Sequence, residues 1–277
     1  MKLSLSNCLF FIGCCMMPGL QLLSQVQYHA NLDQSNAVEA MWVDSVFNSM
    51  TWEQRVGQLI MVRSYSNQGS EQAAAVEKLV RDYHVGGVCF FKGSPDEQVR
   101  LVNKYQAAAK LPLLIAIDGE WGLNMRMPDV ISFPRQLMLG AIRNNQLIYD
   151  MGQEIARQMK LTGVHVNFAP VVDVNNNPAN PVIGTRSFGE DRVNVTVKSV
   201  HYMKGMQDNG ILACAKHFPG HGDTDVDSHL DLPVISHDWE RLDSIELYPF
   251  RALVHQGVGS MMVAHLEVPA LEKKPHY

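Results

Sequence analysis

The sequence predicts an α/β fold of the TIM-type (β/α)8 barrel class, with about six of the eight strand–helix units present. The chain has 277 residues, and barrels of this class use about 250 residues as a single unit. Six short apolar runs alternate with helical stretches, which indicates parallel strands joined by helices. Polar loops rich in glycine and proline follow most of these runs, at the strand ends where ligand groups gather in such folds.

Each predicted strand is rich in Val, Ile, Leu or Met, as expected for parallel strands that are buried on both faces. The predicted strands are residues 58–62, 87–91, 113–117, 164–168, 211–215 and 260–264. An eight-stranded barrel needs two more strand–helix units, and no strand is predicted after Ala264. The barrel is therefore expected to be incomplete within this sequence.

The helical stretches lie between the strands. They are residues 70–83, 97–109, 146–161, 195–209 and 239–256. Several end at a glycine, such as Gly163, Gly210 and Gly257, which suits a helix C-terminus. Ahead of the first strand, Thr51 is expected to cap a short helix that begins at Trp52.

The composition is typical of a globular protein with a sizeable core. Hydrophobic residues make up 46% of the chain and charged residues 18%, which excludes an intrinsically disordered protein. The formal net charge of −5 provides no strong basic field for nucleic acid or for an anionic membrane surface. We therefore expect no nucleic-acid partner, and no pattern indicates an obligate protein partner.

The first 25 residues differ from the rest, because Lys2 is their only charge and a largely apolar run follows it. This pattern is typical of a secretory signal peptide, with Ser24 as a candidate last residue before cleavage. A lipoprotein leader is the alternative, since Cys14 follows Ile and Gly. We expect an exported protein that is periplasmic, anchored to the outer membrane as a lipoprotein, or extracellular.

Two further segments follow this leader. Residues 26–50 form an N-terminal lead-in, and residues 51–277 form the barrel, which is expected to stop before its seventh strand. Beyond the leader the chain has two cysteines, Cys89 and Cys214, and both lie in apolar strand runs. They are predicted to be buried thiols, with no disulfide framework and no CxxC metal site.

The densest polar stretch, KHFPGHGDTDVDSH at residues 216–229, follows the fifth predicted strand directly. His217 and His221 have the spacing of a helical zinc motif, but a Pro-Gly pair between them would break that helix. A calcium loop is discarded because Ser228 and Val234 occupy the positions of its required Gly and Glu. The glycines are too few for a phosphate-binding loop, and a polar loop without any role is disfavoured by this density of histidine and aspartate.

Acid–base chemistry with a histidine is the interpretation that remains. Asp227 and His229 are two residues apart, so in an extended loop both side chains face the same way. A carboxylate that accepts a hydrogen bond from the imidazole orients the ring and favours its charged form, which suits a general acid. Lys216 and His217, at the end of the strand, supply hydrogen-bond donors for a polyhydroxylated ligand.

Residues 216–229 closely resemble the signature of glycoside hydrolase family 3, in its β-N-acetylglucosaminidase branch. The similarity extends over roughly residues 50–277. Four other segments resemble blocks of the same family, and they are IDGEWG at 117–122, NFAPVVD at 167–173, IGTRSFG at 183–189 and MVAH at 262–265.

The resemblance implies sugar-binding roles for four residues and catalytic roles for two. The sugar-binding residues are Asp118, Arg186, Lys216 and His217. The general acid/base is His229, with Asp227 as its partner. Trp121 is either a core residue or a stacking wall for a sugar face, and His265 either contacts the ligand or supports residues that do.

The resemblance also implies a nucleophilic aspartate at the end of a seventh strand, which we expect outside these 277 residues. The segment from Glu267 onward resembles the linker before that strand, so neither Glu267 nor Glu272 is given this role. The implied activity is retaining hydrolysis of terminal β-linked N-acetylglucosamine through a covalent glycosyl-enzyme, without a metal or cofactor. The alternatives are a glycoside phosphorylase on the same scaffold and a truncated, catalytically dead sugar-binding chain.

Overall fold

The computed structural model describes residues 37–225 and 232–271. The chain divides into two compact units, residues 1–55 and residues 56–277. In the first unit residues 37–49 are helical, and the guanidinium of Arg55 lies 3.7 Å from the centre of the Phe47 ring. No helix in the described ranges combines the length and apolar character that a membrane crossing needs.

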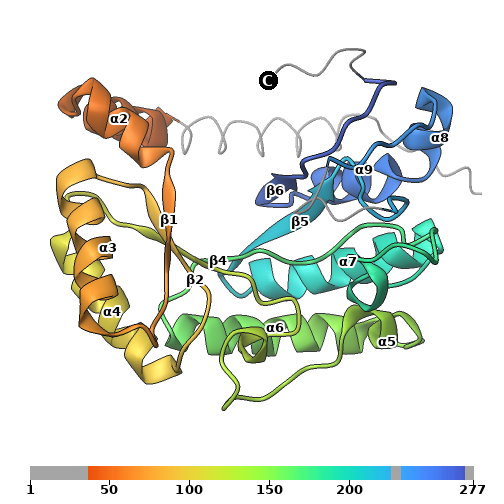
Figure 1. Ribbon diagram of the computed structural model, residues 1–277, viewed down its shortest axis with the longest axis horizontal. Helices are drawn as coiled ribbons and strands as arrows, with labels where there is room; N and C mark the ends of the chain where they lie inside the picture. Colours follow the sequence, from red (N-terminus) through yellow and green to blue (C-terminus); the bar gives the residue numbers. More distant parts are fainter. Residues whose placement is uncertain (1–36, 226–231, 272–277) are drawn as a thin grey trace, which may run out of the picture. The chain divides into compact units, whose positions relative to one another are not determined.

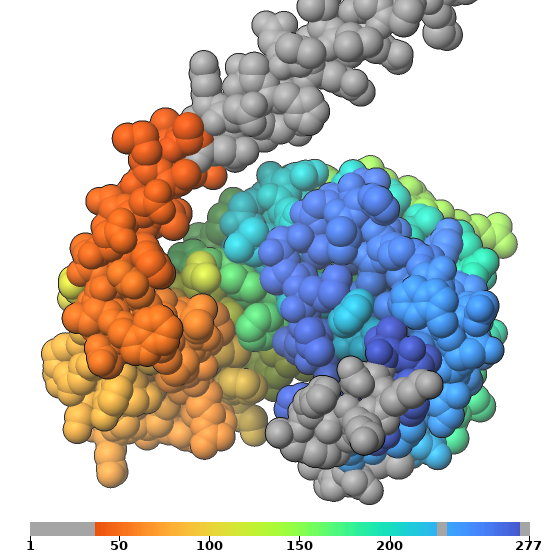
Figure 2. Space-filling view, turned by 90° about the horizontal axis from the view of Figure 1, so that it is seen from above, coloured from red at the N-terminus to blue at the C-terminus, as the bar shows by residue number. Residues whose placement is uncertain are grey.

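The second unit contains one sheet of six parallel strands in chain order. The strands are β1 (Met61–Ser64), β2 (Gly87–Phe90), β3 (Leu114–Ile117), β4 (Val166–Asn167), β5 (Leu212–Phe218) and β6 (Ser260–Val263). Helices connect successive strands, so the sheet curls as in an incomplete TIM-type barrel, and the predicted fold class is confirmed (Figure 1). Between the first strand–helix units and the last ones, the space-filling view shows a hollow (Figure 2).

All six predicted strands exist, but several bounds differ from the prediction. The first strand begins at Met61 because the helix ahead of it runs through Gln58. Only Val166 and Asn167 of the predicted fourth strand keep strand geometry. The fifth strand instead extends to Phe218, so it carries the Lys216–His217 pair within the sheet.

Eight α-helices are described with their bounds. They are α2 (Trp52–Gln58), α3 (Gly69–Tyr83), α4 (Pro95–Ala108), α5 (Gln136–Gly140), α6 (Gln146–Leu161), α7 (Arg192–Gln207), α8 (Trp239–Ser244) and α9 (Leu247–His255). The Thr51 hydroxyl accepts a hydrogen bond from the Gln54 backbone N–H at 3.4 Å, and the Gln54 side chain accepts one from the Thr51 N–H at 3.2 Å. This reciprocal cap confirms the predicted start of α2.

The helix predicted over residues 239–256 is wrong in one respect, since the structure has two helices, α8 and α9, in its place. Pro249 accounts for the break. In a continuous helix its nitrogen would face the carbonyl of Ile245, four residues earlier, but proline has no N–H and its ring clashes with that carbonyl. Ile245 accordingly ends α8 outside helical geometry, with φ −122° and ψ −67°.

Both faces of the sheet are buried, as the apolar strands predict. On one face Val88 and Ile115 pack into the main core together with the helices. On the other face Cys89, Ala116 and Val166, which are neighbours across β2, β3 and β4, form a separate apolar cluster. Cys89 and Cys214 are free and buried as predicted, and burial raises the pKa of Cys89 to about 12, which makes it an unreactive thiol.

Helices α6 and α7 pack closely because glycines lie at their contact. A Cβ atom on Gly205 would lie 2.2 Å from the carbonyl oxygen of Tyr149 and 3.0 Å from the Cα of Gly152. This approach places Tyr202 of α7 fully inside the core, where its hydroxyl donates a hydrogen bond to the carbonyl oxygen of Glu120 at 3.1 Å. The glycine contact therefore positions the loop after β3.

Replacing Gly205 by alanine tests this contact. The added methyl group meets backbone atoms, which cannot move aside as a side chain can, so we expect Gly205→Ala to destabilise the fold by about 1–3 kcal/mol. For a chain of this size that lowers Tm by about 2–12 °C in a thermal unfolding measurement. Lys160→Ala, on the exposed side of α6, is the control and should leave Tm nearly unchanged; an unchanged Tm for Gly205→Ala would contradict the packing argument.

Candidate active site

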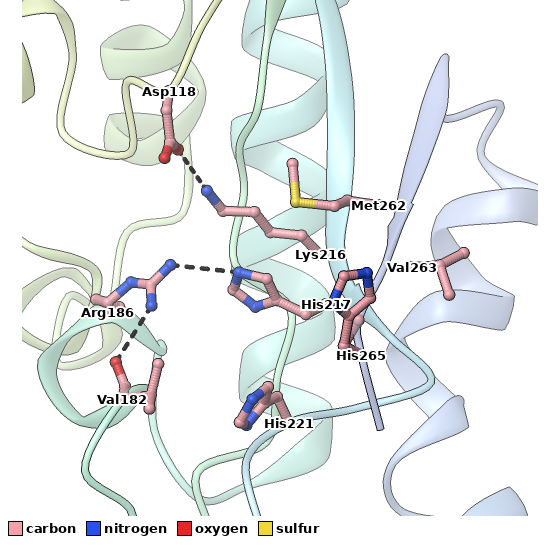
Figure 3. Close-up of a pocket in the computed structure, with 10 residues that line it drawn as sticks. Asp118, Val182, Arg186, Lys216, His217, His221, Met262, Val263 and His265 are labelled. Atoms are coloured by element: carbon pink, nitrogen blue, oxygen red, sulfur yellow. Dashed lines mark hydrogen bonds and ion pairs between the residues drawn. The ribbon is translucent and has the colours of Figure 1, made fainter. Parts of the chain in front are cut away.

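A cavity of about 350 Å³ opens where β3, β5 and β6 end (Figure 3). The four residues predicted to bind a sugar all line it: Asp118, Arg186, Lys216 and His217. Its other lining residues are Val182, His221, Met262, Val263, Ala264 and His265. The structure thus brings together side chains that are almost 100 residues apart in sequence, as the carboxyl ends of neighbouring parallel strands require.

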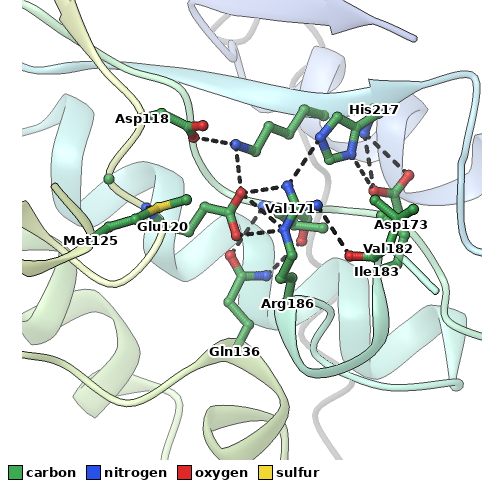
Figure 4. Close-up of polar contacts among 12 residues, drawn as sticks. Asp118, Glu120, Met125, Gln136, Val171, Asp173, Val182, Ile183, Arg186 and His217 are labelled. Atoms are coloured by element: carbon green, nitrogen blue, oxygen red, sulfur yellow. Dashed lines mark hydrogen bonds and ion pairs between the residues drawn. The ribbon is translucent and has the colours of Figure 1, made fainter. Parts of the chain in front are cut away.

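A buried carboxylate, Glu120, lies at the centre of the polar contacts (Figure 4). Its side chain is 1% exposed. The Lys216 Nζ lies 2.7 Å from Glu120 Oε1, and the Arg186 guanidinium donates to both carboxylate oxygens, at 2.6 Å from Nη2 and 2.9 Å from Nε. Glu120 therefore fixes the positions of two predicted sugar-binding side chains.

The charge balance of this cluster decides the protonation of Glu120. Burial raises the pKa of this carboxyl, but Lys216 and Arg186 more than compensate and lower it to about 2. Glu120 is therefore ionised at neutral pH. Lys216, 1% exposed, is a buried cation whose charge is met by two carboxylates, Glu120 and Asp118.

Asp118 is the more accessible of these two carboxylates. Its Oδ1 lies 2.6 Å from Lys216 Nζ, and its Oδ2 lies 2.6 Å from Arg126 Nη2. The side chain keeps 23% of its surface exposed and lines the cavity. Two cations hold it in one orientation, so it presents a fixed hydrogen-bond acceptor at the cavity.

His217 is oriented by a second buried carboxylate, Asp173. The imidazole Nδ1 lies 2.7 Å from Asp173 Oδ2, and Arg186 Nη2 lies 3.3 Å from Nε2 of the same ring. Arginine only donates, so Nε2 accepts from Arg186 and the ring proton sits on Nδ1, where it is donated to Asp173. Burial raises the pKa of Asp173, but the contacts with His217 and two backbone N–H groups lower it overall.

The side chain of Asn167, in β4, hydrogen-bonds to the backbone of the loop that carries Asp118 and Glu120. The Asn167 side chain accepts from the Gly119 N–H at 3.0 Å and donates to the Gly119 carbonyl at 3.1 Å. A Cβ on Gly119 would lie 2.8 Å from the end of the Met159 side chain and 3.2 Å from Asn167, so a larger residue here would require these side chains to shift.

Other candidate residues lie in different positions. Asp227 and His229 fall outside the described residues, so their placement stays a prediction. The Trp121 ring packs against the guanidinium of Arg135, 4.3 Å from the ring centre. His265 is exposed and lines the cavity, which favours ligand contact over a supporting role.

Sequence reasoning missed three residues that organise the site: Glu120, Asp173 and Arg126. The signal for Glu120 was present, because it stands two residues after Asp118 in a loop that follows a strand. Asp173 likewise closes a segment that follows a strand. The ion pair of Arg126 with Asp118 could not be found from spacing alone, since it depends on the turn between them.

One cluster of potential metal ligands lies among the described residues. Asp223, His237 and Glu246 each offer a ligand atom within 4.8 Å of the others. The guanidinium of Arg241 already contacts both carboxylates, at 3.3 Å from Asp223 and 3.1 Å from Glu246. This guanidinium would repel a metal cation, so we do not assign Asp223, His237 and Glu246 as a metal site.

This fold and site define a barrel protein with a polar small-molecule site at the carboxyl ends of its strands. Residues 51–277 match the family model described as Glycosyl hydrolase family 3 N terminal domain. Beta-hexosaminidase A of Pseudoalteromonas piscicida is 34% identical over 250 residues, which cover 80% of this chain and 42% of that protein. Beta-hexosaminidase LpqI of Mycobacterium tuberculosis is 36% identical over 223 residues, covering 78% of this chain and 55% of that protein.

Solved structures agree with these relatives. A glycoside hydrolase family 3 beta-N-acetylglucosaminidase from Paenibacillus sp. str. FPU-7 has a TM-score of 0.76 at 39% identity, covering 82% of this chain and 44% of that one. The beta-glucoside phosphorylase BglX has a TM-score of 0.78 at 25% identity, covering 83% and 41%. The chain therefore belongs to glycoside hydrolase family 3, and it spans about half the length of the curated relatives it matches.

Glu120→Gln tests the central ion cluster. Removing the carboxylate charge leaves Lys216 and Arg186 incompletely paired, which we expect to cost about 3–5 kcal/mol of unfolding free energy at neutral pH. The folded pKa of about 2 lies below the ordinary 4.5, so the contribution of Glu120 is full above pH 4.5 and is lost as pH falls towards 2. Urea unfolding at several pH values should therefore show the two proteins converging as the solution is acidified.

Glu154→Gln is the matched control. The pKa of Glu154 is also lowered to about 2, chiefly by hydrogen bonds from Arg157 and Gln158, but this pair is exposed on α6. Exposed pairs contribute about 0–1 kcal/mol, so this variant should unfold almost as the parent does. If Glu120→Gln loses no more unfolding free energy than the control, the buried cluster contributes no more to stability than an exposed ion pair.

Proposed function

We propose that this chain forms the sugar-binding part of a retaining glycoside hydrolase that releases terminal β-linked N-acetylglucosamine. The single observation that carries the proposal is that Asp118, Arg186, Lys216 and His217 converge on one cavity. Two relatives named beta-hexosaminidase and a solved family 3 beta-N-acetylglucosaminidase support the choice of sugar. If residues 1–25 direct export, as their pattern predicts, extracellular or cell-wall glycans are the substrates.

The proposed binding mode follows from the charges that line the cavity. A sugar ring offers hydroxyl groups, each of which both donates and accepts. Asp118 provides a fixed acceptor, while Lys216 and Arg186 provide donors that Glu120 holds in place. Charge-assisted hydrogen bonds of this kind are roughly twice as strong as neutral ones, so this set suits a polyhydroxylated ligand.

The proposed chemistry takes two steps. A carboxylate attacks the anomeric carbon while His229, paired with Asp227, protonates the departing oxygen; His229 then removes a proton from the water that releases the sugar. Asp118, Glu120 and Asp173 are each occupied by cations or N–H donors, so none is assigned as the nucleophile. We assign that role to an aspartate at a further strand end, as the family resemblance implies.

A glycoside phosphorylase is the second candidate, and the similarity to the structure of the beta-glucoside phosphorylase BglX favours it. In that reaction phosphate replaces water in the second step. Incubating the product of the complete open reading frame with a β-N-acetylglucosaminide in phosphate buffer distinguishes the two. A sugar phosphate as the main product would favour the phosphorylase, and free N-acetylglucosamine of retained configuration favours the hydrolase.

Asp118→Asn tests sugar binding without requiring turnover. The asparagine keeps the shape but loses the charge that strengthens its hydrogen bonds, which are worth about 1.5–3 kcal/mol each to a charged group. We expect the Kd for N-acetylglucosamine, measured by calorimetry or ligand-observed NMR, to rise roughly 10- to 100-fold. Asp129→Asn, exposed in the same loop, is the control. Equal affinities of all three proteins would show that Asp118 does not bind the sugar.

His229→Ala tests the acid/base role in the product of the complete open reading frame. Protonation matters most when the leaving group is poor, so kcat/KM for a phenyl β-N-acetylglucosaminide should fall by about 10²–10⁴-fold. The loss for the dinitrophenyl glycoside should be far smaller, and Asp227→Asn should show a milder form of the same pattern. Ser228→Ala serves as the control from the same segment. Equal losses on both substrates would rule out general acid catalysis by His229.

A further inference from the structure

A second cavity, of about 460 Å³, opens at the carboxyl ends of β1, β2 and β3. Its walls come from the segments that follow these strands, and they include Ser66, Lys92, Ser94, Asn124 and Arg126. Within the described part of the chain, this cavity and the sugar cavity share no lining residue. It is therefore a separate feature at the same end of the barrel.

The backbone around this second cavity is held by contacts between the ends of β1 and β2. The Ser66 N–H donates to the Lys92 carbonyl at 2.8 Å, and the Ser66 hydroxyl accepts from the Ser94 N–H at 3.1 Å. Gly93 has φ +143°, and a Cβ there would collide with the Ser66 side chain, which is 8% exposed. These contacts set the backbone positions of Lys92 and Ser94.

The turn after β3 supplies another wall of this cavity, and it is equally well held. Asn124 Nδ2 donates to the carbonyls of Pro128 and Val130, both at 3.1 Å. Arg126 donates to Asp118 through two nitrogens, from Nε to the carbonyl oxygen at 3.0 Å and from Nη2 to Oδ2 at 2.6 Å. No hydrogen bond from its third nitrogen, Nη1, to another described residue is formed. Arg126 thus keeps N–H donors for a ligand while its orientation is already set.

The lining of the second cavity is positively charged and rich in hydrogen-bond donors. Lys92 is exposed and forms no ion pair within the described ranges, and the Ser94 hydroxyl makes no capping hydrogen bond to α4. Among the described residues that line the cavity there is neither Asp nor Glu. Asp96 and Glu97 follow on α4 outside this lining, and Glu97 is bonded to Arg100. The charge that complements this lining is therefore negative.

We propose that the second cavity binds an anionic group with several oxygen atoms, a phosphate or a carboxylate. Lys92 and Arg126 supply the positive charge, and the Ser94 hydroxyl supplies a further donor. Hydrogen bonds between ionised partners are roughly twice as strong as neutral ones, so such a group is favoured over a neutral ligand.

Two sources share this chemistry. One is free inorganic phosphate, which is independent of the proposed function. The other is an acidic group on a sugar whose ring occupies the neighbouring cavity, and this source rests on the proposed function. Arg126 makes the second source structurally reasonable, because it lines the second cavity and is ion-paired with Asp118 of the sugar cavity.

The test is a titration of the product of the complete open reading frame with inorganic phosphate, followed by calorimetry and phosphorus NMR. Sodium chloride keeps the ionic strength constant, so that screening is not mistaken for binding. We expect Lys92→Gln to raise the Kd for phosphate roughly 10-fold, and Lys92→Arg, which keeps the charge, to stay within about 3-fold of the parent.

Lys110→Gln is the matched control, since it removes an exposed lysine just past the other end of α4. Its Kd for phosphate should equal that of the parent. Absence of phosphate binding in the parent, or the same Kd in Lys92→Gln as in Lys110→Gln, would overturn the anion site.

A comparison of N-acetylglucosamine with its 6-phosphate identifies the source of the anion. If the 6-phosphate binds roughly 10-fold more tightly and Lys92→Gln removes that gain, an acidic sugar occupies both cavities. If phosphate binds but the 6-phosphate shows no gain, the site takes a free anion; either result supports the site. Phosphate binding without any binding of N-acetylglucosamine would overturn the proposed function alone, which separates the two failures.

Discussion

The geometry of the site depends on one buried carboxylate. Glu120 joins Lys216 of β5 to Arg186 of the loop after β4, and both cations are separated from it by more than 60 residues in sequence. A buried ion pair roughly breaks even between desolvation and attraction, so the consequence of this cluster is geometric more than stabilising. Glu120 contacts both cations at once, so the ends of β3 and β5 and the loop after β4 are tied together through one carboxylate.

The two carboxylates that Lys216 contacts have different roles. Glu120 is almost inaccessible and orients the cations, whereas Asp118 keeps part of its surface in the cavity. Because Arg126 also contacts Asp118, the acceptor that a ligand meets is already oriented before binding. Such pre-organisation removes part of the ordering cost of binding, since no charged side chain has to be immobilised when the ligand arrives.

The sequence predicts the sheet well because strands buried on both faces must be apolar throughout, and short apolar runs bounded by glycine and proline are easy to recognise. The ends of helices and strands are harder to predict. The break between α8 and α9, for example, depends on how Pro249 meets the carbonyl of Ile245, four residues earlier. Lys216 and His217 could be inferred from their place after a strand, while Asp118 and Arg186 came from the family resemblance. The role of Glu120 was not predicted, because a loop carboxylate can be recognised as an organising residue only once the structure shows which cations surround it.

Three buried carboxylates, two after strands β3 and β4 and one at the start of α9, each join polar segments of the chain. Glu120, Asp173 and Glu246 are each at most 2% exposed, and each accepts hydrogen bonds from segments that are far apart in sequence. The loops they join are rich in glycine and proline and have little apolar surface with which to pack. A buried charge without its donors is costly, so each carboxylate penalises any conformation in which its loops separate. Polar loops thereby gain a unique arrangement that an apolar core alone would not impose on them.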